Sequence, residues 1–204
     1  KKVLDGACGT GYGTSLISRV AEISIGIDCD KSAIEYANLV YKNKNTEFKT
    51  SFVEATEFND SEFDVVLSFE TVEHTLCPNS HIREIERIIK PDGIAVLSVP
   101  NNWGLTNHHF WNFDFPMFKS LLEKYFGEIE YFYNNSDHYD GIKGIGPFID
   151  TNNAECIIAV CKKPLKSNYN YNRYNLIMEE VYEGVFMRHT QNIKKKSFIK
   201  EFIS

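Results

Sequence analysis

The stretch Val3–Gly13, VLDGACGTGYG, decides the architecture of this chain. Two apolar residues and an aspartate come first, and four glycines then follow within eight residues. Glycine is used where backbone must approach a ligand closely or adopt φ > 0. Apolar residues at helical spacing come next, at Leu16, Ile17 and Val20. The pattern predicts a buried strand, a tight glycine turn and a helix whose first N–H groups face electron-rich ligand atoms.

The spacing of these glycines separates two classes of nucleotide cofactor. The dinucleotide-binding fingerprint is G-x-G-x-x-G/A. Counted from Gly9, its third small residue falls on Thr14, and counted from Gly11 it falls on Leu16. Neither Thr14 nor Leu16 is the glycine or alanine that the fingerprint requires, so the spacing argues against an NAD-dependent oxidoreductase.

Length and composition limit the class of protein. The chain has 204 residues, of which 43% are hydrophobic and 25% charged, as is typical of one globular domain. No apolar run approaches the roughly 20 residues of a membrane span, and no signal peptide is visible. Five cysteines without a C-x-x-C pair argue against a disulfide framework or a zinc site and for a reducing cytoplasm. Because the first strand begins within two residues of Lys1, we expect a further N-terminal segment.

Charge is unevenly distributed along the chain. Residues 1–161 carry 13 Lys/Arg and 24 Asp/Glu, a net charge of −11, whereas residues 162–204 carry 9 and 4, a net charge of +5. Affinity for nucleic acid depends on neutralising phosphates, so the acidic main body disfavours DNA and RNA as partners. We therefore expect a small-molecule substrate, with the basic tail as a solvated face.

Strands and helical stripes alternate after the glycine turn. Strands are predicted at residues 23–28, 46–50, 63–69, 94–99, 128–133 and 157–161, with helical stripes at 33–40, 82–89 and 118–125. Lys90–Gly93 is predicted to end the second of these helices in a turn. This order predicts a doubly wound α/β sheet with ligands at the carboxyl ends of the first, second and fourth strands.

Two segments stand apart from this pattern. Residues 134–155 form a long connection, which is either a lid over the acceptor or a loop without a function. Beyond Pro164, apolar residues recur at helical spacing at Leu176, Ile177, Val181 and Val185. Such a helix needs a partner for its apolar face, either the main body or a second chain in a homodimer. We therefore divide the chain into a domain at 1–163 and a helical extension at 164–204.

Three motifs together resemble class I S-adenosylmethionine (SAM) methyltransferases. They are D-x-x-x-G-x-G at Asp5–Gly11, E-x-x-E-H at Glu70–His74 and K-P-x-G at Lys90–Gly93. The resemblance extends from Val3 to Lys162. Within it, the chain is similar to methyltransferases that act on small molecules and glycans. It implies a seven-stranded, mostly parallel Rossmann-like sheet whose last strand is antiparallel.

The resemblance also implies the cofactor SAM, with S-adenosylhomocysteine as the product. The residues expected to bind it are Asp5, Gly6, Ala7, Cys8, Gly9, Gly11, Asp28, Cys29, Glu54, Ala55, Ser68, Phe69 and Glu70. Asp28 follows Asp5 by 23 positions and ends the second strand, where an acid accepts hydrogen bonds from ribose hydroxyls; a surface helix cap is the alternative. In the family, an acid followed by alanine contacts the adenine, which matches Glu54 and Ala55.

A hydroxyl acceptor needs a general base to take up its proton, or a metal ion that lowers the pKa of its oxygen. The E-x-x-E-H pattern resembles a metal-binding signature of ubiquinone-biosynthesis O-methyltransferases and small-RNA 2′-O-methyltransferases, which add a later histidine. That resemblance implies Glu70, Glu73, His74 and either His108 or His109 as ligands of Mg²⁺, Mn²⁺ or Zn²⁺, with His109 favoured. Catalysis would then involve His74, His109 and Glu73, as metal ligands, as base and positioning groups, or with a structural role only.

The aromatic residues after the fifth predicted strand bear on the identity of the acceptor. Four aromatic residues, Trp103, Phe110, Trp111 and Phe113, form either an acceptor wall or plain core. The resemblance implies an O-methyltransferase whose acceptor is a sugar hydroxyl in surface-glycan biosynthesis, with a quinone-type phenol second and the 2′-OH of RNA third. A non-catalytic SAM-binding scaffold is the alternative from another class.

Overall fold

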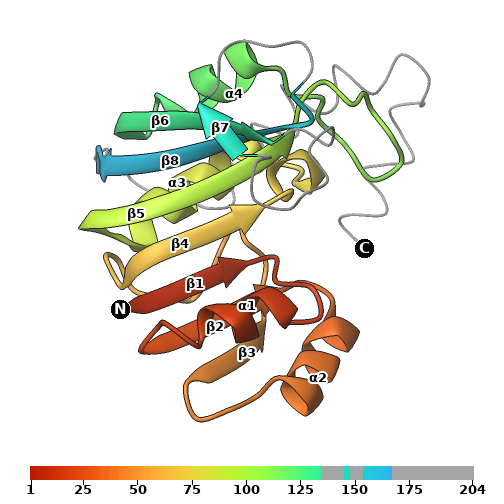
Figure 1. The fold of residues 1–204 in the computed structure, drawn as a ribbon, viewed down its shortest axis with the longest axis vertical. Coiled ribbons are helices and arrows are strands. Elements are labelled where there is room, and N and C mark those ends of the chain that lie inside the picture. The colour runs from red at the N-terminus through yellow and green to blue at the C-terminus, as the bar shows by residue number, and fades with distance from the viewer. Residues whose placement is uncertain (135–144, 148–153, 167–204) are drawn as a thin grey trace, which may run out of the picture.

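The computed structural model describes residues 1–134, 145–147 and 154–166 of the chain (Figure 1). The strands are β1 (Lys2–Gly6), β2 (Ile23–Asp28), β3 (Thr46–Thr50), β4 (Phe63–Phe69), β5 (Ile89–Pro100), β6 (Phe126–Asn134), β7 (Ile145–Pro147) and β8 (Cys156–Pro164). The helices are α1 (Tyr12–Ile17), α2 (Lys31–Val40), the 3₁₀ turn η1 (Val72–His74), α3 (Pro78–Ile88) and α4 (Phe115–Leu122). None of the helices in these ranges is long and apolar enough to cross a membrane.

The strands form one sheet in the order β3-β2-β1-β4-β5-β8-β6-β7. The pairs from β3 to β5 are parallel, and β8 pairs antiparallel with both β5 and β6. The predicted doubly wound sheet with an antiparallel last long strand is confirmed. The short strand β7 is added at the edge, within the predicted long connection. The rest of that connection, residues 135–144 and 148–153, and the predicted C-terminal helix beyond residue 166 lie outside the described residues.

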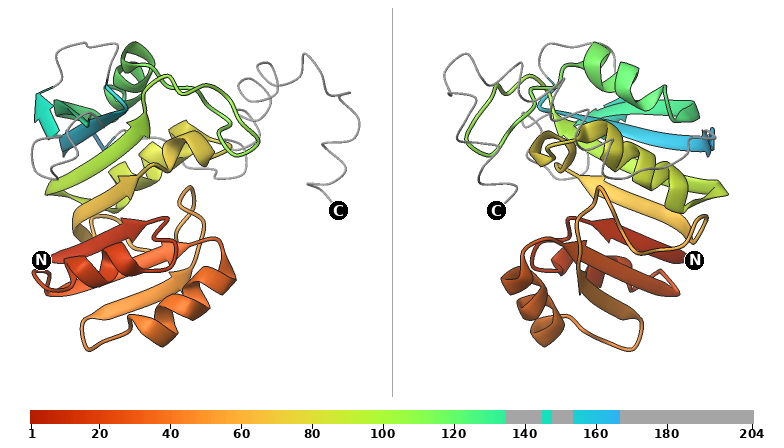
Figure 2. Two further views of the ribbon diagram at one scale, coloured as in Figure 1. Left: turned by 45° about the vertical axis from the view of Figure 1, so that its right-hand side comes forward. Right: turned by 180° about the vertical axis from the view of Figure 1, so that it is seen from behind.

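Helices lie on both faces of the sheet (Figures 1 and 2). α1 and α2 lie beside β1, β2 and β3, whereas α3 and α4 cover the opposite face of the remaining strands. The apolar side of α3, with Ile82, Ile85 and Ile88, joins Val66 and Leu97 of the sheet in the main core. This burial of aliphatic side chains is the chief driving force for docking the helix.

The predicted apolar stripe of the first helix is only partly correct. α1 ends at Ile17, and Leu16 and Val20 are 47% and 90% exposed. The buried side chain of the helix is instead Thr14, whose hydroxyl donates to the Asp5 carboxylate at 2.6 Å. A buried polar side chain needs such a partner, so this hydrogen bond rather than apolar packing orients the short helix.

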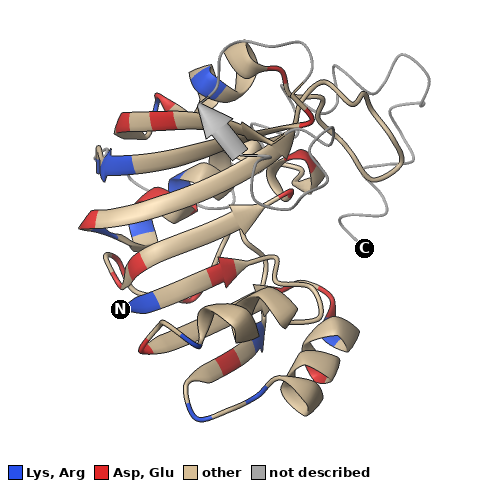
Figure 3. Ribbon diagram, viewed as in Figure 1, with Lys and Arg blue, Asp and Glu red and all other residues tan. Residues whose placement is uncertain are grey.

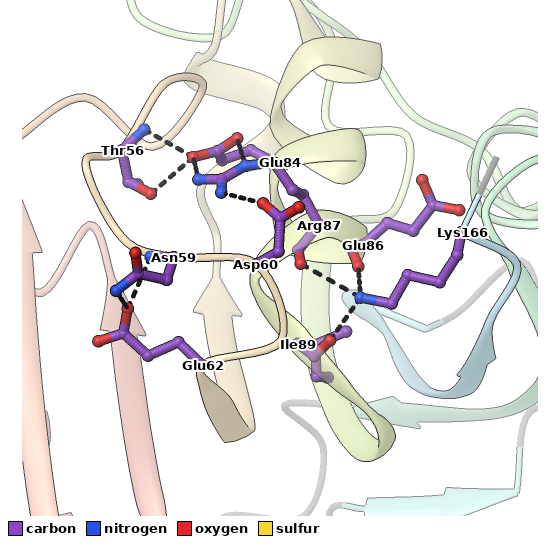
Figure 4. A network of polar contacts seen from close by, with 9 residues as sticks. All are labelled: Thr56, Asn59, Asp60, Glu62, Glu84, Glu86, Arg87, Ile89 and Lys166. Atoms are coloured by element: carbon purple, nitrogen blue, oxygen red, sulfur yellow. Dashed lines mark hydrogen bonds and ion pairs between the residues drawn. The ribbon is translucent and has the colours of Figure 1, made fainter. Parts of the chain in front are cut away.

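A network of charged side chains ties α3 to the segment between β3 and β4 (Figure 4). Glu84 is fully buried and accepts hydrogen bonds from the backbone N–H of Thr56 at 2.8 Å and its hydroxyl at 2.6 Å. Arg87 pairs with Glu84 at 2.7 Å and with Asp60 at 2.6 Å. A buried carboxylate is tolerated because its lone pairs are occupied in this way. The network thereby fixes the segment that carries Glu54 and Ala55.

The side chain of Lys166 binds the C-terminal end of α3. The Nζ of Lys166 donates to the carbonyls of Glu86, Arg87 and Ile89 at 2.7, 3.1 and 2.6 Å, at the C-terminus of α3 (Figure 4). A cation there complements the partial negative charge of the helix end.

Residues 90–93 were predicted to form a turn, but they belong to β5, which starts directly after α3. β5 pairs with β4 through a register shift.

Acidic and basic residues face each other across the antiparallel strands β6 and β8 (Figure 3). Lys162 lies 2.7 Å from Glu130, and Lys163 lies 2.8 Å from Glu128. Exposed pairs of this kind add little to stability. Opposite charges on neighbouring strands do favour this register over one that would align like charges.

Candidate active site

The glycine turn lies at the carboxyl end of β1 and contains three left-handed residues, Ala7, Gly9 and Gly11. Gly11 has φ +87°, and a Cβ atom there would lie 2.6 Å from the Phe48 ring and 2.7 Å from the Ala37 Cβ. Gly9 has φ +52°, but a Cβ atom there would meet no atom within 4 Å. Gly11 is therefore required by close packing behind the loop, whereas Gly9 presents open space to a ligand.

Asp28 connects this loop to the end of β2. Its carboxylate accepts the Gly9 N–H at 2.9 Å and the Asp30 N–H at 2.8 Å, and the Cys8 N–H donates to the Ile27 carbonyl at 2.8 Å. Because each carboxylate oxygen can accept more than one hydrogen bond, Asp28 retains capacity for a ligand hydroxyl. The helix cap that competed with this role is supplied by Asp30, which accepts from the N–H groups of Ser32 and Ala33.

Asp5 has an internal role in the loop. It is buried, and burial raises the pKa of its carboxyl group, while Thr14 donates to it. Burial also raises the pKa of the Cys8 thiol to about 12, so this sulfur is a neutral thiol at physiological pH. Neither group offers a nucleophile, which is consistent with a loop that binds through its backbone.

The predicted adenine-binding pair lies on the same side of the sheet as Asp28. The pKa of the Cys29 thiol is raised by burial and by the charges of Asp28 and Glu54, which places both carboxylates near this residue. Glu54 and Ala55 are half-buried. Their contact with a nucleoside remains a prediction.

The last two residues of β4, Ser68 and Phe69, belong to the predicted binding set and differ in burial. The Ser68 side chain is fully buried and lies 3.3 Å from Nε2 of His81 in α3. The side chain therefore faces α3, and the place of Ser68 in the cofactor-binding set stays a prediction. Phe69, the next residue, is exposed, as alternation along a strand requires.

Glu70 and His74 do not share one turn of an α-helix, although their spacing of four residues would allow it. Residues 72–74 form a short 3₁₀ turn, and Glu70 precedes it with φ +48°. Its carboxylate accepts the Ser98 hydroxyl at 2.6 Å and the Cys156 thiol at 3.6 Å. The predicted four-ligand cluster is reduced to Glu73, His74 and His109, whose ligand atoms lie within 4.8 Å of one another.

Glu73 is a buried carboxyl group at the centre of this cluster. Its two oxygens have no hydrogen-bond partner among the described residues. Burial, together with the charge of Glu70, raises the pKa of Glu73 to about 8. The group is thus mainly protonated at neutral pH unless a cation or a protonated imidazole compensates its charge.

His74 is oriented by the backbone of the segment that follows β5. Its Nδ1 lies 2.6 Å from the His108 carbonyl oxygen. Because a carbonyl only accepts, Nδ1 carries the hydrogen, and the neutral ring has its lone pair on Nε2. The side chain is 42% exposed, and its Nε2 lies 3.6 Å from Oε1 of the buried Glu73.

The segment 101–113 is fixed across this turn. The N–H groups of Phe110 and Trp111 both donate to the Glu73 carbonyl, at 2.8 and 3.2 Å. His109 is thereby brought to a ring distance of 4.8 Å from His74. The pKa of His109 is lowered by burial and then by the charge of His74, so the two rings resist simultaneous protonation.

The four aromatic residues of this segment differ in how deeply their side chains are buried. Phe113 is 2% exposed within the main core, and Trp111 packs against that core and donates its Nε1–H to the Thr75 carbonyl at 2.9 Å. Phe110 is half-buried. Trp103 is 58% exposed, and its ring centre lies 6.5 Å from that of His109. Trp103 is thus the member of the four that offers a face to an acceptor.

Sequence reasoning missed the residues that hold the site together. Ser98 and Cys156 donate hydrogen bonds to the Glu70 carboxylate, although they are 28 and 86 positions away in the sequence. The His108 carbonyl fixes the tautomer of His74 from 34 positions away. Thr14 is the partner of Asp5. A hydroxyl or thiol in a strand carries no local signal, because its partner is decided by strand order.

Comparison with known proteins agrees with this geometry. Residues 4–97 match the family model described as a methyltransferase domain. The chain is 30% identical over 101 residues to a probable S-adenosylmethionine-dependent methyltransferase of Mycolicibacterium smegmatis, covering 50% of this chain and 38% of the relative. It is 29% identical over 110 residues to a ubiquinone biosynthesis O-methyltransferase of Bartonella quintana, covering 51% and 44%.

A solved structure shows the same fold over a larger part of the chain. The putative methyltransferase in a complex with the Haloferax volcanii Trm112 methyltransferase activator matches with a TM-score of 0.63 at 16% identity, covering 80% of this chain and 82% of that one. Residues 4–97 are thus similar to methyltransferase domains, and the solved structure shows that the fold is shared. The chain spans less than half the length of the two curated relatives.

Proposed function

We propose that this protein transfers a methyl group from SAM to a hydroxyl group of a ring-bearing small molecule. The observation that carries this proposal is the orientation of His74, whose Nδ1–H is held by the His108 carbonyl at 2.6 Å. That contact leaves the Nε2 lone pair available to accept a proton, on a side chain that is 42% exposed. A positioned imidazole base is what an alcohol or phenol acceptor needs.

SAM is assigned to the turn between β1 and α1. The open side of Gly9 admits a ligand against the backbone, and Asp28 is in place for ribose hydroxyls. Glu54 and Ala55 are assigned to the adenine. The relatives whose names include S-adenosylmethionine support this cofactor.

The transfer step needs little covalent chemistry from the protein. The acceptor oxygen attacks the methyl carbon in line with the S–CH₃ bond, and that bond breaks with its electron pair moving to sulfur. The hydroxyl proton passes to Nε2 of His74, and neutral S-adenosylhomocysteine remains. Holding the two reactants in line can supply about 7–11 kcal/mol of the barrier in well-oriented cases.

The acceptor class follows from the exposed side chains near the two histidines. Trp103 and Leu105 are 58% and 52% exposed on the segment that carries His109. A flat aromatic face beside an aliphatic side chain favours an acceptor with an aromatic or otherwise apolar ring face. A phenol is therefore the first candidate, in line with the relatives named as ubiquinone biosynthesis O-methyltransferases, and a sugar hydroxyl, which the motifs alone favoured, is the second.

The proposal is tested by incubating the protein with SAM and a panel of phenols, catechols and nucleotide sugars. The product is detected by mass spectrometry as an acceptor carrying one extra methyl group. We expect methylated phenols, with S-adenosylhomocysteine formed in equal amount. Binding of SAM without any transfer would instead favour a scaffold protein, and no binding of SAM would reject the proposal.

A divalent cation at Glu73, His74 and His109 is a second candidate for the same site. The observation that favours it is the buried Glu73 carboxyl without a hydrogen-bond partner among the described residues. One carboxylate and two imidazoles suit Zn²⁺ or Mn²⁺ better than Mg²⁺, which prefers oxygen ligands. A bound cation would lower the pKa of the acceptor hydroxyl.

Metal content distinguishes the two roles of His74. If the cation belongs to the site, Glu73→Gln loses it, whereas Glu70→Gln retains it because Glu70 is engaged by Ser98 and Cys156. Full turnover after treatment with a chelator, with no metal detected by mass spectrometry, would reject the cation and leave His74 as the base.

A further inference from the structure

Glu70 is held at both ends by one residue of the neighbouring strand. Its N–H donates to the Ser98 carbonyl at 3.1 Å and to the Ser98 hydroxyl oxygen at 3.1 Å. The same hydroxyl donates its hydrogen to Oε1 of Glu70 at 2.6 Å. The thiol of Cys156 on β8 lies 3.6 Å from Oε2. Each carboxylate oxygen therefore has its own donor.

These hydrogen bonds from Ser98 and Cys156 hold Glu70 in an unusual backbone conformation. Glu70 has φ +48°, a left-handed conformation that non-glycine residues rarely adopt. Such residues persist where their surroundings over-determine them, and they cluster at functional sites. Ser98 is buried, so its contacts with Glu70 are shielded from water.

Glu70 directly follows β4, next to the strand that leads into the glycine turn. β4 pairs with β1 in a register that places Asp5 beside Leu67, so the turn after Gly6 adjoins the end of β4 that Glu70 follows. On the other side, the charge of Glu70 contributes to the raised pKa of Glu73 and opposes the lowering of the pKa of His109. A fixed negative charge thus stands where donor and acceptor meet.

We propose that Ser98 and Cys156 are positioning residues that aim the Glu70 carboxylate at the sulfonium of SAM and so make the site prefer the charged donor over its neutral product. This inference rests on the proposed function. SAM carries a positive charge on sulfur, and S-adenosylhomocysteine does not. A carboxylate held nearby attracts the first and not the second, and this charge difference also favours release of the product after transfer.

The test compares the dissociation constants of SAM and S-adenosylhomocysteine by calorimetry in the full chain. Glu70→Gln is expected to reduce the preference for SAM by at least about tenfold, since one charge pair is lost. Ser98→Ala is expected to reduce it by about threefold, since one charge-assisted hydrogen bond is lost. In both variants the affinity for S-adenosylhomocysteine stays within about twofold of wild type.

Two pairs of variants separate aiming from plain structural support. Cys156→Ser retains a donor to Glu70 and keeps the preference, whereas Cys156→Ala lowers it. Ser24→Ala is the matched control, because Ser24 is a buried strand serine whose hydroxyl contacts backbone carbonyls, at 3.2 Å to Thr14 and 3.5 Å to Asn45. If Ser98→Ala does not fold, the Cys156 pair decides.

The outcomes distinguish this inference from the proposed function. Equal weakening of both ligands in the Glu70, Ser98 and Cys156 variants, with the preference unchanged, overturns the inference and leaves the methyltransferase proposal standing. Failure of the wild-type protein to bind either ligand overturns both.

Discussion

The Nε2 atom of His74 lies 3.6 Å from Oε1 of Glu73, a carboxyl group buried beneath it. The pKa of Glu73 is raised to about 8, mainly by burial, so at neutral pH the imidazole faces a group that is mostly uncharged. When His74 takes up a proton, the carboxyl can ionise and compensate the new charge. The pair thereby couples proton uptake by the base to a second titration directly beneath it.

Glu73→Gln is expected to change how stability depends on pH. The pKa of Glu73 is raised from 4.5 to about 8 in the folded, metal-free protein, so its folded-state contribution is fully present below pH 4.5 and lost as the pH rises toward 8. Glutamine does not titrate, so the variant should become more stable than wild type by roughly 3–5 kcal/mol at pH 8 relative to pH 4.5. The measurement is urea unfolding across this range.

Other titrating groups cancel in that comparison, because they are common to both proteins. Parallel stability curves for wild type and Glu73→Gln would show that Glu73 is ionised throughout, as a ligand of a bound cation or as half of a persistent ion pair. Repeating the unfolding with added Zn²⁺ separates those two explanations.

His74→Ala is expected to lower kcat by about 10² to 10⁴, the usual contribution of a general base. The affinity for SAM should stay within about twofold of wild type, because the His74 side chain contacts the His108 carbonyl and not the glycine turn. Calorimetry with SAM is the control. Wild-type turnover in His74→Ala would remove the histidine from the mechanism, and lost SAM binding would assign it to the cofactor site.

The order of elements and the glycine turn after β1 were predictable because their signals are local. Alternating apolar residues in β2, the continuous apolar run of β4 and the glycines after Asp5 each specify a strand or a turn without knowledge of the rest of the chain.

The arrangement of the E-x-x-E-H motif was not predictable from spacing. A separation of four residues suggests one helical turn, but the left-handed conformation at Glu70 and the 3₁₀ turn that follows place Glu70 apart from His74. That conformation depends on Ser98, a partner set by the pairing of β4 with β5. Aromatic content likewise did not distinguish Phe113 in the core from Trp103 in solvent, since both environments accept aromatic rings.

The two left-handed glycines of the cofactor turn should respond differently to alanine. Gly11→Ala forces a Cβ atom to within 2.6 Å of the Phe48 ring, in addition to the left-handed backbone at φ +87°. We expect a loss of about 2–5 kcal/mol in unfolding free energy. Gly9→Ala meets no atom within 4 Å and should cost only about 1–2 kcal/mol, while weakening SAM binding. Equal destabilisation of both variants in urea unfolding would contradict this division of roles.

Trp103→Ala should affect the acceptor rather than the fold. Trp103 is 58% exposed, so stability should change by less than about 0.5 kcal/mol, while the KM for a ring-bearing acceptor rises about threefold to tenfold. Phe113→Ala is the matched aromatic variant, and its burial in the main core predicts a loss of about 3–5 kcal/mol. An unchanged acceptor KM in Trp103→Ala would mean that the acceptor binds elsewhere.

The central claim is that the nucleoside of SAM lies at the carboxyl ends of β1 and β2. A crystal structure of the protein with S-adenosylhomocysteine tests it most directly. The account predicts ribose hydroxyls within hydrogen-bond distance of Asp28, the adenine beside Glu54 and Ala55, and the thioether sulfur over the open side of Gly9. Nucleoside density at any other edge of the sheet, or a glycine turn closed by its own side chains in that complex, would contradict it.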